Sequence, residues 1–184
     1  MKVFFDTEFT GLHKDTTLIS IGLISEDRRS FYAELTDYDK KQCNDWIKEN
    51  NLVSSKLESD KKYIPNYHIG TKDNISAALG NWFRQFENVE LVSDVCHYDM
   101  ILLIDLFGNA FNLPENVCPN CYDINQDIAR YYKIDLQTAF DKTREEILWD
   151  NYKENAVGGE KHNALHDAKV IRELYQILNK INFD

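Results

Sequence analysis

The sequence has few residues that break or staple a chain: 3 prolines, 7 glycines and 4 cysteines among 184 residues. They are scattered, so no linker or repeat divides the chain, and we expect one domain over residues 1–184. No apolar run approaches the roughly 20 residues that span a bilayer. The first residues also lack the apolar stretch of about 7–15 residues found in a signal peptide. A cytoplasmic protein is the expectation.

Basic residues are also in short supply. The chain has 31 acidic and 21 basic residues, for a net charge of −10. A module that binds nucleic acid through a broad basic face has the opposite balance. The charge therefore argues against a DNA-wrapping or sequence-reading protein. It does not exclude an enzyme that holds a few terminal nucleotides through bound metal ions.

The cysteines form only one short-range pair, Cys118 and Cys121, while Cys43 and Cys96 are remote in sequence. A structural zinc site usually needs two such pairs, or one pair with nearby histidines. We therefore expect Cys118 and Cys121 to be two reduced thiols in a loop rather than a zinc or redox site.

The hydrophobic pattern predicts an α/β protein. Short β-branched and aromatic runs predict strands at residues 2–9, 17–25, 30–35, 89–96 and 118–124. Apolar residues at three- and four-residue spacing predict helices at residues 39–50, 72–86, 98–111, 124–129, 138–153 and about 163–180. The first three strands have short connections, which favours an antiparallel meander. Strands that then alternate with helices predict a mixed sheet flanked by helices.

The first strand carries two carboxylates, Asp6 and Glu8. Side chains at i and i+2 of a strand point to the same face, about 7 Å apart. Two neighbouring carboxylates in an apolar strand repel each other unless a positive charge lies between them. A divalent cation with oxygen ligands fits that need. The alternative is that the strand has one wet face and both acids face solvent.

A third carboxylate, Asp99, follows the strand expected at residues 89–96 and precedes an apolar helix. An aspartate at this place is also explained as a helix N-cap or first-turn residue. Asp94 competes with it for any catalytic role.

Near the end of the chain, His162, His166 and Asp167 follow two glycines at positions 158 and 159. Five helical residues rotate by about 140°, so His162 and Asp167 converge only if His162 precedes the helix and Asp167 lies in its second turn. The alternative is a zinc-binding pair, His162 with His166, although the glutamate of the zinc-protease motif is missing. The His166-Asp167 dipeptide is also found in all-helical metal phosphohydrolases, but the strand-rich first third counts against that fold.

Together these elements resemble the DEDD superfamily of 3′–5′ exonucleases: Asp-x-Glu on the first strand, an aspartate after an aromatic residue, and a histidine five residues before an aspartate. The histidine spacing is that of the DEDDh branch. The sequence Cys121-Tyr122-Asp123, with Ile128-Ala129-Arg130 after it, also looks like this family. Within the branch, residues 6–9, 18–22 and 31–33 look most like the small bacterial exoribonuclease AS group. Residues 37–75 are not diagnostic, and residues 131–157 match nothing recognisable.

The resemblance implies an RNase H-like fold and a metal-dependent exonuclease that attacks RNA 3′ ends and releases nucleoside 5′-monophosphates. The family pattern assigns two Mg²⁺ or Mn²⁺ ions to Asp6, Glu8, Asp99 and Asp167. It assigns the general base to His162 and contacts with the terminal nucleotide to Thr7, Glu8 and Phe9. A homodimer is the expectation from the same group. The alternatives are a DNA exonuclease on this scaffold, a phosphohydrolase of small nucleotides, and a catalytically idle nucleic-acid-binding module.

Overall fold

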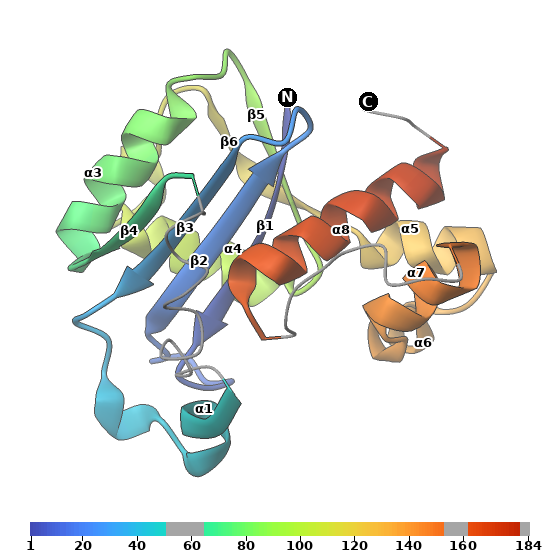
Figure 1. Ribbon diagram of the computed structural model, residues 1–184, viewed down its shortest axis with the longest axis horizontal. Coiled ribbons are helices and arrows are strands. Elements are labelled where there is room, and N and C mark those ends of the chain that lie inside the picture. The colour runs from blue at the N-terminus through green and yellow to red at the C-terminus, as the bar shows by residue number, and fades with distance from the viewer. Residues whose placement is uncertain (51–64, 153–161, 181–184) are drawn as a thin grey trace.

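The computed structural model describes residues 1–50, 65–152 and 162–180. Its centre is a six-stranded sheet with the order β4-β3-β2-β1-β5-β6 (Figure 1). The strands are β1 (Lys2–Phe9), β2 (Leu18–Ser25), β3 (Ser30–Leu35), β4 (Tyr67–Gly70), β5 (Val89–Ser93) and β6 (Val117–Asp123). β1, β2 and β3 form the antiparallel meander, whereas β4, β5 and β6 each pair in parallel with a neighbour. The predicted mixed sheet is confirmed, and β4 is a strand that the pattern did not predict.

The helices follow the expected order but differ in their bounds. They are α1 (Asp45–Asn50), α3 (Lys72–Phe83), α4 (Cys96–Leu106), α5 (Asn125–Tyr132), α6 (Leu136–Asp141), α7 (Arg144–Tyr152) and α8 (Ala164–Asn179), with short 3₁₀ turns at Lys40–Gln42 and Ala110–Asn112. The helix expected at residues 138–153 is two helices, α6 and α7. The helix expected at 98–111 begins earlier, at Cys96, and ends at Leu106. None of the helices in the described ranges is long and apolar enough to cross a membrane.

Two hydrophobic cores lie on opposite faces of the sheet. Because strand side chains alternate, Val3 and Phe5 of β1 pack with α3 and α4, whereas Phe4 packs on the other side with α8. Figure 1 shows α8 crossing one face of the sheet, with α4 behind the other. β1 is therefore covered by helices on both faces. Its acidic residues, Asp6 and Glu8, lie toward its C-terminal end.

The N-terminal end of α8 packs directly on the backbone of β2, at Gly22. A β-carbon at this position would lie 2.2 Å from the backbone nitrogen of Leu165 and 2.3 Å from the carbonyl carbon of Ala164. Gly22 also lies opposite Asp6 in the register of β1 and β2. The missing side chain therefore lets the start of α8 approach β1 beside Asp6.

We expect Gly22→Ala to lower the melting temperature by several degrees, because overpacking typically costs 1–3 kcal/mol and 1 kcal/mol is about 2–4 °C for a chain of this size. Gly80→Ala in α3 is the matched control, since its new methyl group would meet the Phe107 ring at an ordinary 3.6 Å. Thermal unfolding of both variants by circular dichroism provides the measurement. Equal melting temperatures for Gly22→Ala and the parent would contradict this close packing.

The expectation of two reduced thiols is wrong for Cys121, whereas Cys118 is a free thiol. Cys118 and Cys121 lie in strand β6, not in a loop, and the structure has a disulfide between Cys96 and Cys121 with 6.1 Å between their Cα atoms. Because Cys121 is bonded to Cys96, Cys118 and Cys121 do not form a ligand pair. Cys43 and Cys118 are free thiols.

Candidate active site

Asp6 and Glu8 lie at the end of β1 where one side of the strand is open. β5 pairs with β1 only as far as Phe4, opposite Val92, although β1 continues for five more residues. The chain then leaves β5 at Ser93 and turns into α4. This turn brings the residues that follow β5 to the open edge of β1, beside Asp6.

Asp99 is fully buried in the first turn of α4, and two hydroxyl groups hold its carboxylate. Thr7 Oγ1 donates a hydrogen bond to Asp99 Oδ1 at 2.5 Å, and the Ser93 hydroxyl donates to Oδ2. Burial raises the pKa of Asp99 to about 7, although both hydroxyl donors oppose that shift. The carboxylate is therefore fixed in orientation and poorly solvated.

Asp167 is the fourth residue of α8, and His162 lies just before that helix. Asn163 caps the helix by accepting a hydrogen bond from the backbone N–H of His166 at 3.0 Å. His162 has a left-handed backbone (φ 63°), and its N–H donates to Asp167 Oδ2 at 3.1 Å. The predicted convergence of the two residues is present, but Asp167 is in the first turn of α8 and not the second.

The other three predicted carboxylates lie around Asp6. Oxygen atoms of Asp6, Glu8 and Asp167 lie within 4.8 Å of one another, and so do those of Asp6, Asp94 and Asp99. Among the described residues, the Asp6 carboxylate has no hydrogen-bond or ion-pair partner. Burial, and then the charges of Asp99 and Asp167, raise its pKa well above the usual range.

This donor set fits divalent cations. Carboxylate oxygens are the preferred ligands of Mg²⁺, and clustered carboxylates that raise each other's pKa need a positive charge to ionise together. Asp6 belongs to both groups of oxygens, so a cation held by either group would have the Asp6 carboxylate beside it. Among the described residues, neither group includes a histidine.

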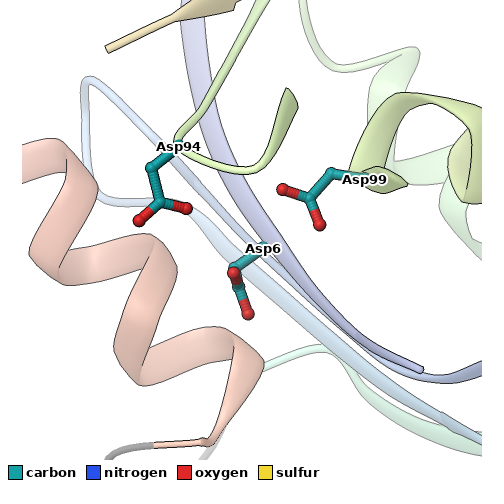
Figure 2. Close-up of side chains that lie close together, drawn as sticks. All are labelled: Asp6, Asp94 and Asp99. Atoms are coloured by element: carbon teal, nitrogen blue, oxygen red, sulfur yellow. The ribbon is translucent and has the colours of Figure 1, made fainter. Parts of the chain in front are cut away.

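Asp94, which the sequence analysis gave as an alternative to Asp99, also lies at the site. Figure 2 shows its carboxylate facing Asp6, with Asp99 on the other side. Both aspartates therefore lie at the cluster, and neither replaces the other. Asp94 was recognisable only as a second aspartate near the end of a strand.

Two further residues at the site were not predicted. Arg144, at the start of α7, forms an ion pair with Asp94, with 2.9 Å between Nε and Oδ2. Trp46 of α1 is half-exposed and meets the His162 ring edge-on, with 5.1 Å between ring centres. Neither residue belongs to a local motif, and Arg144 is 50 residues from its partner, so no pattern in the sequence indicated them.

The residues expected to contact the terminal nucleotide, Thr7, Glu8 and Phe9, are the last three residues of β1. The half-buried Phe9 ring stacks on Tyr98, with 5.2 Å between ring centres and 10° between ring planes. The Thr7 side chain is buried and donates a hydrogen bond to Asp99, and the Thr7 backbone also bonds the Asp99 carboxylate. A pocket of about 330 Å³ opens on the other side of the cluster and is lined by Asp6, His162 and Asp167, together with residues of the α6–α7 turn.

Comparison with known proteins agrees with this geometry. A family model described as a 3′–5′ exoribonuclease Rv2179c-like domain matches residues 1–178. The 3′–5′ exoribonucleases Rv2179c and MT2234.1, from two strains of Mycobacterium tuberculosis, are each 30% identical over 119 residues. The match covers 64% of this chain and 67% of each relative.

Solved structures confirm the predicted fold. The nuclease domain of 3′hExo, a DEDDh family member solved with bound rAMP, has a TM-score of 0.64 at 12% identity, over 97% of this chain and 91% of that one. A 3′ exonuclease structure describing recognition of a histone mRNA stem-loop also scores 0.64, at 11% identity, over 98% and 83%. The cell-death related nuclease CRN-4 scores 0.63 at 12% identity, over 97% and 63%.

Proposed function

The chain belongs to the Rv2179c-like family of 3′–5′ exoribonuclease domains, and we propose that it removes nucleoside 5′-monophosphates one at a time from the 3′ end of single-stranded RNA. It is a hydrolase of the exonuclease class. The observation that carries the proposal is that two sets of clustered carboxylates share Asp6, and that His162 lies beside them. We propose that the catalytic unit is the whole of residues 1–184. The homodimer and the cytoplasmic location stay predictions.

The carboxylates would hold two divalent ions. Asp6, Glu8 and Asp167 would bind one, and Asp6 with Asp99 would bind the other. Two Mg²⁺ or Mn²⁺ ions, when bound, stabilise the attacking and leaving oxygens of an in-line phosphoryl displacement. The protein contributes the orientation of the ligands, since hydroxyl groups fix Asp99 and the N-terminal turn of α8 fixes Asp167.

His162 would act as the general base that accepts a proton from the attacking water, an effect typically worth 10²–10⁴-fold. Its position supports this role because its ring lines the same pocket as Asp6 and Asp167 while it lies outside both carboxylate groups. The hydrogen bond from its backbone to Asp167 ties the base to the ligand set. The edge contact with Trp46 orients the ring from the other side.

The terminal nucleotide would bind at the end of β1. Glu8 and the backbone around Thr7 and Phe9 would meet the terminal 3′-hydroxyl and base, and the Phe9 ring would stack on the base, a contact that tolerates any base. RNA is favoured over DNA because the relatives are named exoribonucleases. The acidic surface fits a short terminal contact rather than a long basic track.

End-labelled oligonucleotides test the polarity and the polymer. With Mn²⁺ or Mg²⁺, 5′-labelled RNA should give a ladder that shortens from the 3′ end, and single-stranded RNA should be degraded faster than DNA of the same sequence. A 3′-phosphate should stop the reaction, whereas a blocked 5′ end should not. The Asp6→Asn protein, purified in parallel, controls for contaminating nucleases.

Other outcomes would redirect the assignment. A faster ladder on DNA would move the substrate to DNA and leave the chemistry unchanged. Internal cuts, or turnover of mononucleotides in preference to oligonucleotides, would contradict the exonuclease proposal. RNA binding without hydrolysis at any metal concentration would indicate an idle binding module.

A further inference from the structure

Asp94 and Arg144 form a largely buried ion pair at the edge of the proposed metal site. Their side chains are only 15% and 13% exposed, and Arg144 Nε lies 2.9 Å from Asp94 Oδ2. The partners come from distant parts of the chain, the turn after β5 and the first residue of α7. Burying such a pair is costly unless its geometry is good and its remaining donors are satisfied. Its presence here therefore calls for a physical explanation.

Arg144 has its donors engaged in protein contacts. Besides Asp94, it donates to Asn125 Oδ1 at 2.6 Å and to the backbone carbonyls of Ala139 and Lys142 at 3.2 and 2.6 Å. Asn125 in turn donates to the backbone carbonyl of Asp94 at 2.7 Å. These bonds use four of the five N–H donors of the guanidinium. Its effect is to fix the position of Asp94.

Asp94 keeps an oxygen that Arg144 does not use. A carboxylate has two oxygens, and Arg144 bonds only Oδ2. An oxygen of Asp94 lies within 4.8 Å of oxygens of both Asp6 and Asp99, and Figure 2 shows the three side chains facing a common space. The distance suits a ligand that binds a shared cation directly or through one of its waters.

We propose that Asp94 is a fifth carboxylate of the metal site, a ligand of the ion shared by Asp6 and Asp99, and that Arg144 is the residue that positions it. This inference rests on the proposed metal-dependent function and adds a residue to it. It also gives the α6–α7 segment a role, because that segment carries Arg144 and lines the pocket beside the cluster.

The test measures Mn²⁺ binding to the full chain by isothermal titration calorimetry, without substrate. Asp94→Asn keeps the size of the side chain and an acceptor for Arg144, so it removes charge with little change of packing. We expect the affinity of one of two bound Mn²⁺ ions to fall by about ten- to a hundredfold, as for groups that support metal ligands. The Mn²⁺ concentration for half-maximal hydrolysis should rise by a similar factor, with activity restored at high Mn²⁺. Asp105→Asn, which alters an exposed acid paired with Lys72, is the matched control.

Arg144→Lys provides the second variant. Lysine keeps the positive charge but cannot donate to Asp94, Asn125 and two carbonyls at once, so the Mn²⁺ affinity of this variant should fall several-fold. This variant tests the proposal even if the Asp94→Asn protein does not fold. Wild-type Mn²⁺ affinity in either folded variant would overturn the proposal and leave the proposed function intact. A parent protein that binds no Mn²⁺ would overturn both.

Discussion

Replacing Asp6 with asparagine is expected to abolish exonuclease turnover and, in the metal-free protein, to raise the melting temperature. Asp6 is the one described residue that belongs to both carboxylate groups, so its loss affects both proposed metal ions. The same change removes a buried charge that is surrounded by other carboxylates. Activity and metal-free stability should therefore move in opposite directions, which distinguishes a lost ligand from a damaged fold.

The pH dependence of metal-free stability follows from the same groups. Burial raises the pKa of Asp6 well above its usual range and that of Asp99 to about 7. A carboxyl group whose pKa is higher in the folded state contributes stability that is fully present below its unfolded pKa, about 4, and is lost as the pH rises through the folded value. The metal-free protein should therefore be less stable at pH 8 than at pH 5.

Thermal unfolding in excess EDTA at pH 5, 6, 7 and 8 provides the measurement. The parent should lose several degrees across the series, and Asp6→Asn should lose less, because one of the coupled carboxyls is gone. Mn²⁺ should stabilise the parent more at pH 8 than at pH 5, since protons compete with the metal for the carboxylates. Full activity of Asp6→Asn, or undiminished activity of the parent in EDTA, would refute the two-metal proposal.

The sequence was most informative about the sheet. β1 and β3 have the predicted bounds because short runs rich in apolar residues, joined by short connections, leave few other arrangements. β4 was missed because it has only four residues, none of them fully buried, and depends on pairing with β3. Helix bounds shifted where the ends are set by tertiary contacts, as at α7, whose first residue reaches across to Asp94.

The site was predictable where its residues sit in short local patterns. The Asp6–Glu8 pair lies on one strand face, and the spacing of His162 and Asp167 fits the start of a helix. Trp46 and Arg144 were missed because each meets the site only through a contact between distant segments. Periodicity reports which face of an element is buried, and it carries no information about which side chain from elsewhere will lie against it.

The last prediction separates His162 from its neighbour His166. At saturating Mn²⁺, replacing His162 with asparagine should lower turnover by about two to four orders of magnitude while leaving Mn²⁺ affinity nearly intact. The physical reason is that His162 lines the pocket beside Asp6 and Asp167 yet belongs to neither group of metal-ligating atoms in the described chain. Turnover at saturating Mn²⁺ therefore measures the loss of the proton acceptor rather than the loss of a metal ion.

His166→Asn is the matched control, because it makes the same change four residues away. His166 is buried in the first turn of α8, about 100° around the helix from Asp167, so its replacement should cost some stability but leave turnover per folded molecule within a few-fold of the parent. If His162 and His166 instead bound zinc as a pair, both substitutions would remove metal and activity together. Calorimetric Mn²⁺ binding and turnover, measured on the two variants side by side, decide between them. If His166→Asn lowers turnover more than His162→Asn does, the assignment of His162 as the base is wrong.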